Sequence, residues 1–165
     1  SKLSPDSIQQ DQMWMQFALA EAATAIYRTR PNPAVGCVIV KDGKIVGEGY
    51  NQVTSTNDPT AHAEVVAIRN ACKNLNTFQL DTCEIYTSCE PCPMCLGAIY
   101  WARPTKIYYA NTREDAKNIG FDDSFIYKEL SLDKKDRKIK EESLCSEEGK
   151  EPFNLWNESE KKIEY

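Results

Sequence analysis

The sequence predicts one α/β domain, a sheet with parallel strand pairs and helices on its faces. Helical and strand-like patterns alternate along most of the chain, which is typical of that fold class. The 165 residues are 41% hydrophobic, which is enough for one substantial core and rather short for two. Because the chain contains no internal repeat and no domain boundary, we expect a single domain over residues 1–165.

The first part of the predicted fold is a helix followed by a hairpin. Apolar residues recur at helical spacing from Asp11 to Arg28, and "RPNP" at 30–33 ends this pattern. The next stretch contains two strand-like runs around Asp42 and Gly43, a pair that is typical of tight hairpins. Residues 35–40 are almost all apolar, so we expect the first of these strands to be covered on both faces.

The second part continues the alternation. The patterns predict, in order, a loop at "STNDPT", a helix from near Ala61, a strand at "CEIYTS", a helix at "PMCLGAIYWAR" with Pro93 in its first turn, a strand at "KIYYAN", a helix at "REDAKNI" and a loop at "GFDDSF". Residues 127–152 are charged and weakly periodic, which fits either an exposed connector or an edge strand. A short helix is expected near the C-terminus.

Charge and cysteine content exclude several classes of protein. The formal net charge is −5, a poor start for a nucleic-acid binder, so a small neutral or cationic substrate fits better. Seven cysteines, an odd number spread through predicted helices and strands, indicate reduced thiols rather than a secreted disulfide framework. The chain has no run of apolar residues long enough to span a membrane and no apolar signal core at its N-terminus. We therefore expect a soluble, cytoplasmic protein without a membrane partner.

The only histidine, together with two cysteines, indicates a zinc site. His62 lies at the start of a predicted helix, and Cys92 and Cys95 lie three residues apart across the start of another. Both sulfurs can therefore face one point, and the N–H groups of a helix start favour thiolate over thiol. Two thiolates and an imidazole form a tripod for Zn²⁺ and leave the fourth position open, as in catalytic rather than structural sites. We expect one zinc ion per subunit.

Glu64 is the candidate general acid/base. Alone it would be an ordinary first-turn glutamate, but beside water activated by zinc it is placed to move protons. The order His-x-Glu, then Pro-Cys-x-x-Cys, is the signature of zinc-dependent nucleobase deaminases. Cys89 precedes the predicted helix, and we interpret it as a buried thiol at the end of a strand.

Four longer motifs resemble one family more particularly. "NDPTAHAEVVAIRNAC", "YTSCEPCPMCLGAIYWAR", "GFDDSFIYKE" and the terminal "KKIEY" are similar to small bacterial guanine deaminases of the cytidine deaminase-like superfamily. The resemblance implies a three-layer α/β/α sandwich around a five-stranded mixed sheet. It also implies that guanine and water are converted to xanthine and ammonia by attack at the amino-bearing carbon C2.

The resemblance assigns a role to each matching residue. It implies that His62, Cys92 and Cys95 hold zinc and that Glu64 is the general acid/base. It implies that Asn51 and the backbone of Ala63 hydrogen-bond the purine, and that Asp123 binds near the leaving amino group and acts as a second proton shuttle. Trp101 would border the pocket, and Tyr165 would close it. Members of the family form homodimers that exchange C-terminal segments. A homodimer that exchanges residues 130–165 is therefore expected, with Tyr165 serving either its own site or the neighbouring one.

Other functions remain open at this point. The stretch "RPNPAVGC" resembles the deaminase domain of riboflavin biosynthesis, and it places Val35 where guanine deaminases carry an aromatic residue. The alternative substrates are guanosine, an adenosine in tRNA, and the diaminopyrimidine intermediate of riboflavin synthesis. A non-catalytic zinc-binding module is the alternative from a different class. In every case acidification should release zinc, because the ligands bind metal deprotonated.

Overall fold

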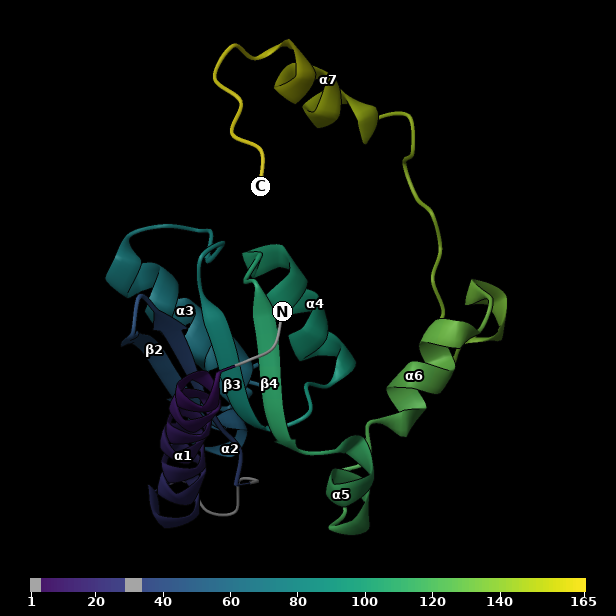
Figure 1. Cartoon of the computed structure of the whole chain (residues 1–165). Helices are drawn as coiled ribbons and strands as arrows, with labels where there is room; N and C mark the ends of the chain where they lie inside the picture. Colours follow the sequence, from purple (N-terminus) through teal and green to yellow (C-terminus); the bar gives the residue numbers. More distant parts are fainter. Residues whose placement is uncertain (1–3, 29–33) are drawn as a thin grey trace. The chain divides into compact units, whose positions relative to one another are not determined.

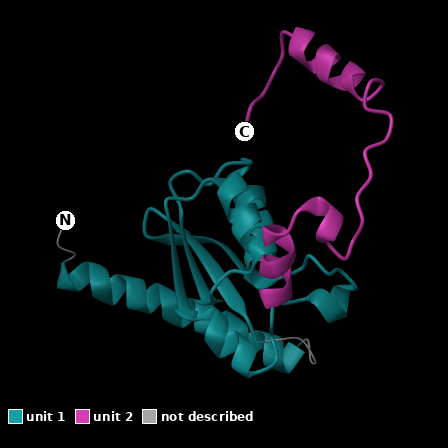
Figure 2. Ribbon diagram, turned by 90° about the vertical axis from the view of Figure 1, so that its right-hand side faces the viewer, with its two compact units in different colours: residues 1–123 teal, residues 124–165 magenta. Residues whose placement is uncertain are grey.

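A computed structural model describes residues 4–28 and 34–165. The chain divides into two compact units, Ser1–Asp123 and Ser124–Tyr165 (Figure 2). The first unit contains the sheet and every residue of the predicted zinc site.

Unit 1 is built on a mixed sheet with the strand order β2-β1-β3-β4 (Figure 1). The strands are β1 (Gly36–Lys41), β2 (Lys44–Tyr50), β3 (Glu84–Cys89) and β4 (Lys106–Asn111). β1 pairs antiparallel with β2 and with β3, and β3 pairs parallel with β4. The predicted hairpin is confirmed, with positive φ angles at Asp42 and Gly43 in its turn.

The expectation of five strands is wrong for the described part of the chain, which forms four. After β4 the chain enters a helix instead of a further strand. Thr112 and Asp115 form a capping box there, each side chain bonding the other residue's backbone N–H, which favours a helix start. The segment that follows is rich in charge and lacks strand-like alternation.

The helices of unit 1 lie on both faces of the sheet. They are α1 (Pro5–Arg28), α2 (Val53–Thr56), α3 (Ala63–Leu75), α4 (Pro93–Ala102) and α5 (Arg113–Asn118). α1 covers one face, and α3 and α4 cover the other (Figure 1). The short helix α2 was not predicted, and its last two residues, Ser55 and Thr56, belong to the stretch predicted as a loop. No helix in residues 4–28 and 34–165 combines the length and the apolar character of a membrane span.

β1 is buried on both faces, as its sequence predicts. Cys37 and Ile39 face the core beneath α3 and α4. Val38 and Val40 face the core beneath α1, which contains Trp14. Alternate residues of a strand point to opposite faces, so a continuous apolar run is what a central strand between two helical layers requires.

Small residues let α3 lie directly on β2. A Cβ atom at Gly49 would stand 2.6 Å from the carbonyl oxygen of Ala63, and one at Gly47 would stand 2.6 Å from that of Ala67. Neither distance is sterically allowed, so only glycine permits this approach. The glycines thereby set how the first turn of α3, which carries His62 and Glu64, lies over the sheet.

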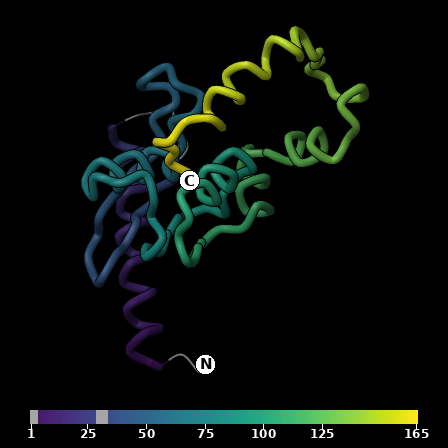
Figure 3. Tube along the Cα trace, turned by 90° about the horizontal axis from the view of Figure 1, so that it is seen from above, coloured from purple at the N-terminus to yellow at the C-terminus, as the bar shows by residue number. Residues whose placement is uncertain are grey.

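α1 is longer than the strands that it crosses. Its 24 residues extend about 36 Å, whereas strands of six or seven residues span about 20 Å. The N-terminal turns of α1 therefore project beyond the sheet (Figure 3), and its buried residues begin at Trp14. The stretch "RPNP" at 30–33, predicted to end this helix, lies outside the described residues.

Side chains of α3 bond the outer strand of the sheet. Asn70 Nδ2 donates to the carbonyl oxygen of Glu48 at 2.8 Å, and Asn74 Nδ2 donates to that of Val46 at 2.9 Å. An exposed strand edge presents unpaired carbonyl groups to other chains. These two asparagines satisfy part of the β2 edge from within the chain.

Unit 2 contains α6 (Ser124–Ser131), a 3₁₀ helix (Lys134–Asp136) and α7 (Lys150–Glu158). None of its described residues is buried. It exposes the apolar side chains of Phe125, Leu130, Ile139, Leu144, Phe153, Leu155, Trp156, Ile163 and Tyr165. A segment without a core of its own gains little stability from the burial of apolar surface.

Glu21 and Glu48 form a carboxyl pair between α1 and β2. Burial, followed by the charge of Glu48 and a hydrogen bond with it, raises the pKa of Glu21 to about 7. The folded protein therefore holds this proton more tightly than the unfolded chain, and stability falls as pH rises from about 4.5 to 7. Above pH 7 the folded state carries the full cost of ionising Glu21.

Replacement of Glu21 by glutamine is therefore expected to stabilise the protein above pH 7. Because the carboxyl group is partly solvated, the expected gain in unfolding free energy is about 1 kcal/mol at pH 8, with none near pH 4. Urea unfolding at both pH values measures it. The E48Q and E21Q/E48Q variants test the pairing, since the double variant should gain less than the two single gains added together. An equal effect of E21Q at both pH values would contradict the prediction.

Candidate metal centre and active site

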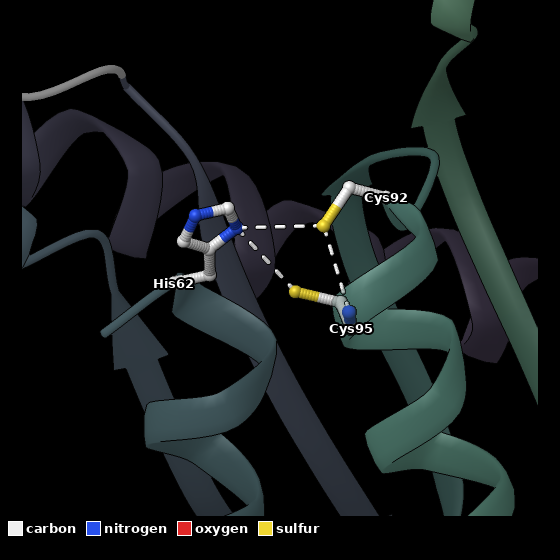
Figure 4. Close-up of side chains that lie close together, drawn as sticks. All are labelled: His62, Cys92 and Cys95. Carbon is white, nitrogen blue, oxygen red and sulfur yellow. Dashed lines mark hydrogen bonds between the residues drawn. The ribbon is translucent and has the colours of Figure 1, made fainter. Parts of the chain in front are cut away.

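The predicted ligands meet where two helices begin. His62 is the N-cap residue of α3, and Cys92 is the N-cap residue of α4, with Pro93 directly after it. Cys95 lies in the first turn of α4, and its backbone N–H donates to Cys92 Sγ at 3.5 Å. The three side chains point toward one another (Figure 4).

The spacing of the ligand atoms fits a tetrahedral zinc ion. His62 Nδ1 lies 3.6 Å from Cys92 Sγ and 3.5 Å from Cys95 Sγ. Zinc–sulfur and zinc–nitrogen bonds of about 2.3 and 2.0 Å at a tetrahedral angle place sulfur and nitrogen about 3.5 Å apart. All three ligand atoms lie within 4.8 Å of one another, and the described residues form no other such group. The donor set and its spacing therefore fit zinc.

The surroundings of Cys92 favour its thiolate form, which is the form that binds metal. A hydrogen bond from Cys95 and others from His62 and the backbone lower the pKa of Cys92 to about 4, although burial opposes them. The same bond to Cys92, together with burial, raises the pKa of Cys95. Zinc binds the deprotonated sulfurs, so its binding releases any proton that the pair holds.

Glu64 lies against this group from a buried position. It sits in the first turn of α3 and is 4% exposed. Its Oε2 accepts a hydrogen bond from Cys95 Sγ at 3.3 Å, and its Oε1 accepts one from Thr87 Oγ1 at 3.0 Å. Burial raises the pKa of Glu64, whereas these hydrogen bonds lower it. A carboxyl group with a raised pKa that borders a metal centre suits proton transfer.

Asn51 and Ala63 flank the site. Asn51 directly follows β2 and is 6% exposed, and its Oδ1 accepts a hydrogen bond from the N–H of Val53 at 3.0 Å. This bond fixes which way the side-chain amide faces. Ala63 is fully buried and separates His62 from Glu64 in the chain. The positions of both residues agree with the roles expected of them, which stay predictions.

Asp123 comes near Cys92 across a long stretch of chain. It is half-buried, and burial followed by the charge of Cys92 raises its pKa, while Arg113 opposes the shift. Its neighbour Asp122 is exposed. The structure thus distinguishes the two acids of "GFDDSF" and places the predicted one within electrostatic reach of the metal centre.

Trp101 and Tyr165 are both exposed side chains. Trp101 is 61% exposed and lies six residues beyond Cys95 on α4, about 9 Å farther along the helix. Tyr165 belongs to unit 2 and is 68% exposed. Their predicted contacts with the purine stay predictions.

The remaining cysteines take no part in the metal group. Cys89 ends β3 only half-buried, and burial raises its pKa to about 11. Cys37 and Cys83 are buried in the core, Cys72 is partly buried, and Cys145 is exposed. All of them are free thiols, as the sequence predicts. The sequence did not predict the contact between Thr87 and Glu64. Its only signal was that Thr87 is a polar residue within a buried strand.

A His/Cys/Cys zinc site with a buried glutamate beside it, on an α/β sheet, defines a zinc-dependent deaminase. A family match supports this class, since residues 8–111 match the cytidine and deoxycytidylate deaminase zinc-binding region. The chain belongs to the cytidine and deoxycytidylate deaminase family. His62, Cys92 and Cys95 are the zinc ligands of that region.

Within this family the chain is strongly similar to guanine deaminases. It is 58% identical to guanine deaminase of Bacillus subtilis (strain 168) over 130 residues, which cover 79% of this chain and 83% of the relative. The X-ray structure of guanine deaminase from Bacillus subtilis superposes with a TM-score of 0.89 at 50% identity, covering 93% of this chain and 98% of that one. The predicted resemblance and the cytidine deaminase-like fold are thereby confirmed.

A second group of relatives is more distant. The tRNA-specific adenosine deaminase of Aquifex aeolicus (strain VF5) is 41% identical over 97 residues, which cover 59% of this chain and 63% of the relative.

Proposed function

We propose that this protein hydrolyses guanine to xanthine and ammonia. The observation that carries the proposal is the buried carboxyl of Glu64 at 3.3 Å from a zinc ligand, in a chain that is 58% identical to a guanine deaminase. A structural zinc site has no use for such a carboxyl. The reaction forms a C2–O bond from water and breaks the C2–N bond of the exocyclic amine.

When bound, zinc supplies the Lewis acidity that makes water nucleophilic near neutral pH. Glu64 supplies the proton transfers. Its Oε2 faces the metal centre, takes one proton as water attacks C2 and passes it to the ring nitrogen. It then takes the second proton from the new hydroxyl group on C2 and passes it to the departing amine. Because Glu64 is buried, these transfers take place with little competition from bulk solvent.

The remaining site residues bind the purine. Asn51 and the backbone of Ala63 hydrogen-bond the base, while Asp123 lies near the leaving amino group and serves as a second proton shuttle. Trp101 and Tyr165 border the pocket. The support is strongest for Asn51 and Asp123. Asn51 is almost fully buried, and the charge of Cys92 helps to raise the pKa of Asp123.

The alternative substrates receive less support. A tRNA substrate requires a positive docking surface, and the chain carries a net charge of −5. Guanosine and the diaminopyrimidine of riboflavin synthesis keep the same chemistry at the metal centre. Ammonia release from each compound distinguishes them, and faster turnover of any of them than of guanine would overturn the proposed substrate.

Asp123 offers a matched test of substrate binding. Replacement of Asp123 by asparagine is expected to lower kcat/KM for guanine about a hundredfold, because the amide can neither carry the charge nor transfer the proton. Replacement of the exposed neighbour Asp122 by asparagine should change kcat/KM less than about threefold. Steady-state ammonia release measures both variants. Equal effects of the two changes would remove Asp123 from the mechanism.

We also propose that the protein is a homodimer in which residues 130–165 pack on the neighbouring subunit. The support is that unit 2 has no buried residue and exposes a run of apolar side chains, while α4 exposes Tyr100 and Trp101. Together these surfaces are too apolar to remain uncovered in water. Light scattering on the full chain should give the mass of two subunits, and a monomer at micromolar concentration would contradict the proposal.

A further inference from the structure

Thr87 links Glu64 to the sheet. It lies in β3, is fully buried, and its Oγ1 stands 3.0 Å from Glu64 Oε1 and 3.0 Å from the carbonyl oxygen of Cys89. A buried hydroxyl is costly unless it is hydrogen-bonded. Both neighbours are acceptors and the hydroxyl has one proton, which a charged carboxylate at Glu64 attracts more strongly than the carbonyl of Cys89 does. The hydroxyl therefore makes a hydrogen bond that a purely apolar residue of the same size could not make.

Thr87 itself is held rigidly. Its strand is paired on both sides, with Cys37 of β1 and Tyr109 of β4 opposite Thr87. A β-branched side chain on a strand also has few χ1 choices. The position of Oγ1 is therefore set by the centre of the sheet rather than by the flexible carboxylate that it contacts.

The two oxygens of Glu64 face different groups. Oε1 faces Thr87, and Oε2 faces Cys95 Sγ at 3.3 Å. Glutamate has three rotatable side-chain bonds, and without Thr87 the carboxylate would keep only the contact with Cys95 and a hydrogen bond to the backbone of its own residue, neither of which joins it to the sheet. The bond at Oε1 fixes the plane of the carboxylate and directs Oε2 toward the metal centre.

We propose that Thr87 is a positioning residue that holds the carboxylate of Glu64 in its reactive orientation. The inference rests on the proposed function only in taking Glu64 as the group that transfers protons. Thr87 Oγ1 bonds Glu64 and the backbone of Cys89 rather than a metal ligand, and it acts through the orientation of Glu64.

The test compares T87V, which keeps the shape and removes the hydroxyl, with T87S, which keeps the hydroxyl and removes a methyl group. T87V is expected to lower kcat for guanine by about ten- to a hundredfold, with KM changed less than about threefold and zinc content unchanged. T87S should keep kcat within about threefold of the unaltered protein, although its urea midpoint falls through the lost methyl group. The loss of activity is therefore expected in T87V and the loss of stability in T87S.

Crystal structures of both variants supply a readout independent of turnover. Glu64 should occupy more than one conformer in T87V and a single one in T87S. Unchanged kcat in T87V, equal loss of kcat in both variants, or a loss that follows zinc content would overturn the role of Thr87. If the unaltered protein releases no ammonia from guanine, the proposed function fails instead, and the conformers of Glu64 still decide the positioning role.

Discussion

Replacement of Glu64 by glutamine is expected to lower kcat by about a thousandfold while zinc stays bound. Glutamine has nearly the same shape and still offers an oxygen to Thr87 Oγ1, so the bond seen at 3.0 Å can persist. It cannot take a proton from water at the position of Oε2. The chemical step therefore loses its proton acceptor, whereas the three zinc ligands are untouched.

Ammonia release under substrate saturation, with metal analysis of the same sample, measures the effect of E64Q. Glu114→Gln is the matched control, because Glu114 also lies in the first turn of a helix but is exposed. It should retain full activity. Turnover by E64Q equal to that of the control would mean that Glu64 is a structural residue, and the non-catalytic zinc module would then be the better interpretation.

Removal of zinc is the second change with a large expected effect. Chelation should reduce ammonia release to background, and added zinc should restore it, because without the metal water is too weak an acid to give its proton to Glu64. Zinc binds the folded site better than the unfolded chain. Free zinc at a thousand times its dissociation constant should therefore add up to about 4 kcal/mol to the unfolding free energy.

Two cysteine variants distinguish the effect of losing a zinc ligand from the effect of losing a buried thiol. Cys95→Ser should lose both zinc and turnover, since a serine hydroxyl is a poor ligand for zinc compared with a thiolate. Cys83→Ser alters a buried thiol in the same core outside the metal group, and it should keep zinc at one ion per subunit. Full activity in chelator-treated protein, or in a zinc-free C95S variant, would contradict the mechanism.

The metal centre could be predicted because local signals define most of its geometry. His62, Cys92 and Cys95 all lie within a turn of a helix start, and Pro93 sets one of those starts. Short-range rules of helix initiation therefore place the ligands, and the sheet only has to bring two helix ends together. β1 was predictable for the same reason, since an unbroken apolar run has few other interpretations.

Features that depend on long-range contacts escaped prediction. The bond between Thr87 and Glu64 joins residues 23 apart in sequence, and periodicity carries no signal for it. The fifth strand was expected from a family resemblance, but the capping box at Thr112 starts a helix where further pairing would have to begin. In unit 2 the short helix expected near the C-terminus is present as α7. The start of α6 was not predicted, since Ser124 and Phe125 belong to the stretch expected to be a loop.

The most direct test of the account is ammonia release from guanine by the zinc-loaded protein, followed together with xanthine formation and zinc content. We expect one ammonia for each xanthine, at a rate that rises with zinc occupancy up to one ion per subunit and exceeds the rates with guanosine, adenine and cytosine. A fully zinc-loaded protein that leaves guanine unchanged would contradict it.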